Sequence, residues 1–249
     1  MSRFYVDMAL DEPLTFCLPP EAARHAQVLR LQRGDTVVLF NGQGLQWTGQ
    51  IEAMASRGEV WVALQQSVAP AVELPLEVTL AVGMPANDRM DNLVEKAAEL
   101  GAAGLQPLVC ERSVLKLEGE RASRRVTHWT GVATAACEQS GRVKLPQVHP
   151  VRRLKDWLDS LPSSSEPVPA RFVLSFAPDA KRLPAAVSAL REQSPITLLS
   201  GPEGGLSSAE EALARSQGFV PVTLGPRVLR ADTAPLAALA VIGALCEGA

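Results

Sequence analysis

From Val78 onward, the chain alternates short apolar runs with helix-like stretches, and this alternation constrains the fold more than any other feature. The runs VTLAVGM, LQPLVC, FVLSF, ITLLS and VPVTLG are rich in Val, Ile and Leu, as buried strands are. Residues 88–100 and the stretch around 126–137 carry apolar side chains at helical spacing. Strands that alternate with helices form a mainly parallel sheet covered on both faces. The sequence therefore predicts an α/β fold over residues 74–249.

Residues 1–70 follow a different pattern. The segments LTFCL, DTVVLFN, LQWTGQIE and EVWVALQ are typical of short strands, and NGQG (Asn41–Gly44) offers turn chemistry between the second and the third. One helix, from Pro20 to about Leu31, interrupts them. We interpret this region as a small, partly closed β-barrel domain. The Ala- and Pro-rich stretch from Val68 to Pro75 is interpreted as a linker, and the residues SSSEPVP (163–169) as a surface loop.

Composition excludes several classes of protein. The chain has 249 residues, of which 47% are hydrophobic, so it is not a largely disordered chain. The longest apolar run, Ala234–Cys246, is too short to span a bilayer, and the N-terminus lacks the pattern of a secretory signal. We therefore expect a cytoplasmic protein. The four cysteines and three histidines lie far apart, which predicts reduced, mostly buried thiols and no metal site. The cysteines are Cys17, Cys110, Cys137 and Cys246.

The charge of −3 does not by itself indicate a nucleic-acid-binding protein. Its distribution is uneven, however. Between Arg121 and Lys155 there are eight positive residues and a single acid, Glu138. Such a stretch can neutralise several phosphates, or it can simply be a solvated helix face. The sequence leaves both interpretations open.

Two glycine loops follow strands of the predicted sheet: SGPEGG (Ser200–Gly205) and LGPRVLRADTA (Leu224–Ala234). Parallel sheets bind ligands beyond the carboxyl ends of their strands. Neither loop matches a P-loop or GxGxxG, and the carboxylate of Glu203 repels phosphate. Ser207 and Glu210 form a predicted capping box that occupies the amides of the next helix.

These features favour an uncharged adenosine head with a cationic centre as the ligand, held by backbone groups and by apolar walls. Leu224, Val228 and Leu229 are the candidates for those walls. The alternative is that the loop glycines Gly201 and Gly205 merely turn the chain. Two such loops at strand ends favour the ligand site.

Several motifs, taken together, resemble one known family. GPEGGLS followed by LGPRVLRADTA looks like the second and third motifs of SPOUT methyltransferases, and EKAAELG, ERS and ACEQSGR resemble the RsmE type. The N-terminal segments RFYV and HAQVLRLQRGD match the PUA-like domain of that family. The resemblance covers nearly the whole chain.

The resemblance implies a SPOUT-type sheet with a C-terminal trefoil knot in residues 74–249 and a PUA-like, RNA-binding barrel in residues 1–70. It also implies S-adenosylmethionine as the cofactor, a homodimer, and ribosomal RNA of the small subunit as the partner. The implied reaction is methylation of N3 of a uridine, U1498 of 16S ribosomal RNA. By motif match, Gly201, Gly205, Leu224, Gly225 and Leu229 would bind the cofactor, and the apolar walls described above add Val228. The C-terminal helix, apolar nearly all round and therefore expected to be buried, would pack on the knot and the partner subunit.

The chain departs from the family pattern at two places. It has Asp232 where members usually have Glu, a carboxylate one methylene shorter. The loop PANDRMD carries Pro85 and Ala86 where a Lys-Gly pair is usual, although Arg89 is kept.

We predict that Arg230 steadies the uracil oxygens as negative charge develops and that Glu203 or Asp232 takes the N3 proton. The alternative for Arg230 is a salt bridge to Asp232 that braces the loop. The predicted RNA contacts are Arg3, His25, Arg30, Arg89 and Arg142, with ordinary surface positions as the alternative for those in the small domain. Two rival functions share the expected fold: methylation of a ribose 2′-hydroxyl, and non-catalytic RNA binding.

Overall fold

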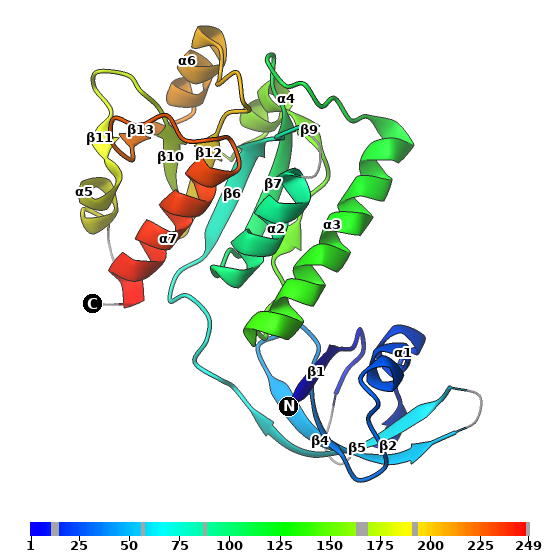
Figure 1. Ribbon diagram of the computed structural model, residues 1–249. Helices are drawn as coiled ribbons and strands as arrows, with labels where there is room; N and C mark the ends of the chain where they lie inside the picture. The colour runs from blue at the N-terminus through cyan, green and yellow to red at the C-terminus, as the bar shows by residue number, and fades with distance from the viewer. Residues whose placement is uncertain (11–14, 56–57, 87–88, 163–168, 191–193, 248–249) are drawn as a thin grey trace. The chain divides into compact units, whose positions relative to one another are not determined.

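The computed structural model describes residues 1–10, 15–55, 58–86, 89–162, 169–190 and 194–247. The chain divides into two compact units (Figure 1). The first unit consists of Met1–Glu73 together with Cys137–Leu145, and the second consists of Leu74–Ala136 together with Pro146–Ala249. A short segment from the middle of the chain therefore belongs to the N-terminal unit, which local sequence patterns did not predict.

The described part of the first unit contains a mixed sheet with the strand order β1-β3-β4-β5-β2. Its elements are β1 (Ser2–Tyr5), β2 (Thr15–Cys17), α1 (Pro20–Val28), β3 (Thr36–Phe40), β4 (Gln46–Met54) and β5 (Val60–Val68). The hairpin predicted at Asn41–Gly44 is confirmed, because β3 and β4 pair antiparallel on either side of it. Among the described residues no pairing joins β1 to β2, so the sheet is an open path and its closure into a barrel stays a prediction.

Two details of the first unit differ from the prediction. The segment at the N-terminus forms β1, which pairs parallel with β3, whereas the sequence pattern did not identify it as a strand. Parallel partners far apart in the chain leave no turn signal between them. Helix α1 ends at Val28 rather than near Leu31. Arg30 then has a φ of 57°, which no helix accommodates.

The second unit is built on a parallel sheet with the strand order β11-β13-β10-β12-β6-β7-β8, and β9 also pairs with β7. Its strands are β6 (Val78–Gly83), β7 (Gly104–Val109), β8 (Gln147–Val148), β9 (Arg152–Arg153), β10 (Ala170–Leu174), β11 (Lys181–Arg182), β12 (Ile196–Ser200) and β13 (Val220–Thr223). Every recorded pairing in this sheet is parallel. The α/β prediction is therefore confirmed. The two-residue strands were missed because segments so short carry no periodicity.

Helices cover both faces of this sheet (Figure 1). They are α2 (Arg89–Glu99), α3 (Gly119–Ser140), α4 (Leu154–Asp159), α5 (Leu183–Ser188), α6 (Ser208–Ser216) and α7 (Thr233–Glu247). On one face, Leu199 of β12 and Leu108 of β7 pack with Trp157 of α4 and Ala214 of α6. Helices α2 and α7 lie on the other face (Figure 1). Consecutive strand residues point to opposite faces, so both faces need apolar side chains, which explains the continuous apolar runs.

Helix α7 corrects one expectation. Pro235 lies in its first turn, as predicted, and Leu239 and Ile242 are fully buried. Within the single chain, however, Ala240, Ala244 and Leu245 are exposed, so the helix is buried along one side only. No helix in the described residues is long and apolar enough to cross a membrane. The predicted helix start at Asp88 and most of the predicted 163–169 loop lie outside the described residues.

Candidate functional site

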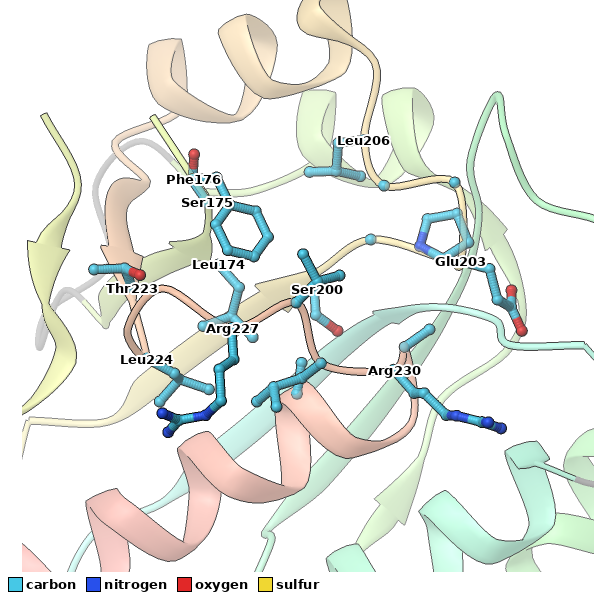
Figure 2. A pocket seen from close by; sticks show the side chains of 18 of the residues that line it. Leu174, Ser175, Phe176, Ser200, Glu203, Leu206, Thr223, Leu224, Arg227 and Arg230 are labelled. Carbon is cyan, nitrogen blue, oxygen red and sulfur yellow. The ribbon is translucent and has the colours of Figure 1, made fainter. Parts of the chain in front are cut away.

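A cavity of about 660 Å3 opens at the carboxyl ends of β10, β12 and β13. The two glycine loops identified in the sequence both line it, at Ser200–Leu206 and at Leu224–Ala231 (Figure 2). Their strands are not neighbours, because β10 lies between β12 and β13. The second loop reaches the first by crossing the carboxyl ends of β10 and β12 (Figure 2). This crossing is where the resemblance places the trefoil knot, and the knot itself stays a prediction.

The first loop needs its glycines for a tight turn. A Cβ on Gly201 would lie 2.7 Å from the backbone nitrogen of Leu206, a distance that side chains do not tolerate. Gly205 has a φ of +67° and donates its N–H to the carbonyl oxygen of Pro202 over 2.8 Å. Gly201 thus serves the turn itself, whereas no atom of the described residues would lie within 4 Å of a Cβ on Gly205. The turn places the backbone of this loop along the cavity wall.

The loop after β7 braces the first glycine loop. The guanidinium of Arg112 donates to the carbonyl oxygen of Gly204 over 3.0 Å and to that of Leu206 over 3.4 Å. Glu210 accepts the N–H of Glu111 with one carboxylate oxygen and the N–H of Ser207 with the other. The predicted capping box is confirmed, since Ser207 Oγ also accepts the N–H of Glu210. The ERS motif, residues 111–113, therefore holds the first glycine loop in place through these hydrogen bonds.

The second loop begins with a turn at Gly225, whose φ is +115°. Thr223 Oγ1 accepts the N–H of Gly225 over 3.1 Å and stabilises that turn. Leu224 and Leu229 are half-buried at the cavity, and Val228 is 84% exposed. All six predicted cofactor residues therefore line one cavity, although Val228 is largely open to solvent.

The three predicted catalytic residues have different surroundings. Glu203 Oε1 accepts the N–H of Ala86 over 2.9 Å and lies 3.5 Å from the guanidinium of Arg89. Arg230 and Glu203 project on the same side of the cavity (Figure 2). Arg230 forms no ion pair with any described residue, so the alternative brace between Arg230 and Asp232 is not seen. Asp232 does not line the cavity, but its Oδ1 atom is buried and has no hydrogen-bond partner among the described residues.

The sequence analysis missed the part of the wall that follows β10. Leu174, Ser175 and Phe176 line the cavity, and the ring of Phe176 is 67% exposed. Ser175 Oγ donates to Glu211 Oε1 over 2.8 Å and accepts the N–H of Ala177 over 3.0 Å. Leu174, Ser175 and Phe176 end the apolar run FVLSF, so their place at the carboxyl end of a strand could have been read from the sequence. Only the strand order shows that this strand, β10, lies between the two strands that carry the glycine loops.

Two further polar side chains were missed at the cavity. Arg227 extends from the second loop near Leu224 (Figure 2). Ser200, the last residue of β12, has a buried hydroxyl without a hydrogen-bond partner among the described residues. A buried hydroxyl that is left without a partner costs free energy, so it marks a place where a ligand can be bound.

The candidate RNA residues of the first unit are largely engaged in internal contacts. Arg3 donates to the carbonyl oxygens of Gly141 and Arg142 at about 3 Å, and its guanidinium lies 5.1 Å from the centre of the Phe40 ring. Arg142 is buried and pairs with Glu73 over 2.7 Å. We therefore do not retain Arg142 among the RNA contacts. The burial of its guanidinium leaves it no surface for a phosphate.

His25 and Arg30 are more open. His25 Nδ1 lies 3.7 Å from Glu138 Oε2, and the His25 ring packs edge-on against Phe4. The side chain of Arg30 is exposed. Both residues therefore stay predictions as RNA contacts.

The thiols and histidines of the described residues form no group that would hold a metal ion. Burial raises the pKa of the Cys110 thiol to about 12 and that of Cys137 to about 11. Both thiols are therefore protonated at neutral pH and are poor nucleophiles. Cys17 and Cys246 are only partly buried, so the predicted burial of the thiols is confirmed for Cys110 and Cys137 alone.

The parallel sheet, the looped crossing at its carboxyl ends and the separate small β domain define an α/β protein of the SPOUT type with a PUA domain. Comparisons with known proteins agree. The family model for the RNA methyltransferase domain matches residues 72–243, and the model for the RNA methyltransferase PUA domain matches residues 18–65. The chain belongs to this RNA methyltransferase family.

The individual relatives point to one type within the family. Ribosomal RNA small subunit methyltransferase E of Bacillus subtilis is 31% identical, over 97% of this chain and 96% of that protein. The enzyme of the same name from Neisseria gonorrhoeae, solved bound to S-adenosyl methionine, has a TM-score of 0.88 and 35% identity over 98% of each chain. A methyltransferase from Legionella pneumophila, solved with the same cofactor, has a TM-score of 0.86 and 32% identity over 97% of this chain and 96% of that one. The resemblance to the RsmE type is therefore confirmed.

Proposed function

We propose that this RNA methyltransferase transfers a methyl group from S-adenosylmethionine to N3 of a uridine in 16S ribosomal RNA, U1498 by resemblance. The observation that carries the proposal is the meeting of both glycine loops at one cavity. The relatives solved with the cofactor support the choice of donor.

The residues at the cavity fit that cofactor. Leu174, Leu224 and Leu229 provide apolar surface for an adenine ring. The hydroxyl of Ser200, which has no partner in the described part of the chain, offers a hydrogen bond. The carboxylate of Glu203 provides a negative charge for a cationic centre. When bound there, the cofactor supplies a methyl group on a sulfonium, and that chemistry requires no metal.

The chain's own residues have two tasks in this reaction. The N3 proton must leave before the N3 lone pair can form a bond to carbon, and a carboxylate is a suitable acceptor. Glu203 or Asp232 would take the proton: Glu203 lines the cavity but its Oε1 already accepts the N–H of Ala86, whereas Asp232 Oδ1 has no partner among the described residues but lies outside the lining. Arg230 would hold the uracil oxygens as negative charge develops, since a guanidinium donates but does not deprotonate.

We further propose the division of labour between the domains. Residues 1–70 would form the PUA-like, RNA-binding barrel, with Arg3, His25 and Arg30 as contacts, and residues 74–249 the methyltransferase domain, with Arg89 near the target base. An enzyme that acts on ribosomal RNA would work in the cytoplasm.

The assembly is proposed to be a homodimer. Helix α7 supports this, because Ala240, Ala244 and Leu245 leave an apolar stripe exposed in the single chain. Sedimentation of the purified protein at the mass of one chain would contradict it.

The decisive experiment is mass spectrometry of nucleosides from 16S ribosomal RNA and from small subunits that lack the modification, after incubation with the protein and S-adenosylmethionine. We expect 3-methyluridine at a single position. A methyl group on ribose would assign the enzyme to 2′-hydroxyl chemistry instead. The absence of product, together with no heat of cofactor binding in calorimetry, would indicate a non-catalytic RNA-binding protein.

A further inference from the structure

The basic stretch between Arg121 and Lys155 separates into paired and unpaired residues in the structure. Arg142 pairs with Glu73, Arg153 with Glu118, and Lys155 with Asp159. Arg152 donates to Ser160 Oγ and to the carbonyl oxygen of Asp156. By contrast, Arg121 and Arg125 on α3 form no ion pair with a described residue, and both are exposed. Unneutralised charge is therefore concentrated near the start of α3.

These two arginines line a hollow of about 280 Å3 together with Leu115, Leu117 and Arg124. We call this set of five residues the arginine hollow. Arg124 pairs with Glu120 over 2.6 Å, but both side chains are more than 70% exposed. Such a surface pair is worth little, so Arg124 can readily exchange its partner for a phosphate. The hollow thus presents three guanidinium groups beside two leucine side chains.

The arginine hollow lies at the same end of the sheet as the candidate site, beyond the carboxyl ends of the strands. Strand β7 is parallel to β6, which is parallel to β12, so the carboxyl ends of all three strands lie at the same end of the sheet. The segment after β7 contacts the first glycine loop through Arg112 and Gly204. The same segment then forms one wall of the hollow with Leu115 and Leu117 before α3 begins. One continuous segment therefore connects the hollow with the cavity wall.

The chemistry of the hollow fits a phosphodiester. Guanidinium groups bind phosphate oxygens with two parallel hydrogen bonds, and they stay charged at any physiological pH. The whole chain carries a net charge of −3, so attraction of a polyanion requires a local positive surface such as this one. We propose that the arginine hollow binds phosphates of the ribosomal RNA near the target nucleotide. The inference rests on the proposed function, and it assigns a second RNA contact surface outside the small β domain.

The test compares the full-length protein with the double variant Arg121→Gln/Arg125→Gln. Binding of a fluorescently labelled 16S ribosomal RNA transcript and of unmodified small subunits is measured over a series of salt concentrations. Loss of two phosphate contacts should weaken affinity for both and reduce the slope of log affinity against log salt by about 1.4, at about 0.7 for each contact to single-stranded RNA. The KM for RNA should rise while kcat stays unchanged, because the hollow holds RNA and takes no part in the chemistry.

Two control variants make the result specific. Arg121→Lys/Arg125→Lys keeps both charges and should keep most of the salt slope. Lys181→Gln/Arg182→Gln removes two exposed charges from β11, at the opposite edge of the sheet, and should leave the slope nearly unchanged. Thermal unfolding should be the same for all variants, since every changed side chain is exposed.

Three outcomes would overturn the inference: an unchanged affinity and slope in the arginine double variant, an equal loss in the β11 variant, or a loss confined to assembled subunits without a change in slope. The last would assign the hollow to a ribosomal protein. Calorimetry with S-adenosylmethionine keeps this inference separate from the proposed function. If the wild-type protein binds no cofactor, the proposed function fails, whatever the hollow binds.

Discussion

At the scale of single residues, the candidate site depends on a few side chains that lack internal partners. Arg230 forms no ion pair, and the buried Asp232 Oδ1 and Ser200 Oγ have no hydrogen-bond partner within the described residues. Most other charged side chains at the cavity are already engaged, as Glu203 is with Arg89. Buried polar atoms without partners are rare in proteins, and of these two atoms only Ser200 Oγ belongs to the lining of the cavity.

Replacing Arg230 by alanine should lower kcat about a hundredfold, because one donor to a developing negative charge is worth that much. Affinity for S-adenosylmethionine should stay unchanged. Single-turnover methylation of 16S ribosomal RNA and calorimetry with the cofactor measure the two effects. Arg182→Ala on β11 is the control and should behave as wild type. Methylation at the parental rate by the Arg230→Ala protein would show that Arg230 has no catalytic role.

At the scale of elements, the cavity wall depends on how α6 begins. The capping box of Ser207 and Glu210 fixes the first turn of α6, and Glu210 also holds the N–H of Glu111 in the loop after β7. The helix start, the glycine loop before it and the neighbouring loop are therefore one connected structure. Disturbing the cap should affect stability first and cofactor binding second.

Ser207→Ala should lower the free energy of unfolding by about 1 kcal/mol, since the amide of Glu210 loses its acceptor. Urea unfolding followed by circular dichroism measures the change. Ser208→Ala is a matched control, because Ser208 is exposed and makes no cap. Equal stability of the two variants would mean that the capping box contributes nothing.

At the scale of the whole molecule, the first unit is closed by a contact between distant parts of the chain. Glu73 pairs with the buried Arg142 over 2.7 Å, and its other oxygen accepts the backbone amides of Val143 and Lys144. Burial opposes ionisation of this carboxyl, but the hydrogen bonds from Arg142 and from the two amides outweigh it and lower the pKa of Glu73 below its usual 4.5. This ion pair therefore joins residues 137–145 to the N-terminal unit.

The lowered pKa predicts acid sensitivity. A carboxyl whose pKa is lower in the folded state contributes stability that is fully present above the unfolded pKa and disappears as the pH falls through the folded pKa. Glu73→Gln, which leaves Arg142 buried without its partner charge, should cost about 3 kcal/mol at neutral pH. The difference from wild type should shrink below pH 4.5. Unfolding midpoints measured from pH 7 to pH 3 provide the test, and a difference that does not vary with pH would contradict it.

Local patterns in the sequence were sufficient for the α/β alternation, for the hairpin at Asn41–Gly44 and for the capping box at Ser207. Each depends on residues close together in the chain, and apolar spacing or turn chemistry expresses such features directly. The glycine loops were also recognisable, because few other residues form turns like the one at Gly201.

The tertiary structure alone decided which distant parts meet. It placed β10 between β12 and β13, which brought Phe176 to the cavity. It paired Arg142 with Glu73, which withdrew a predicted RNA contact from the surface, and it gave Arg121 and Arg125 no acidic partner among the residues that the structure describes. Strand order and long-range ion pairs depend on the packing free energy of the whole chain. A short segment of sequence contains only local information, so it cannot predict them.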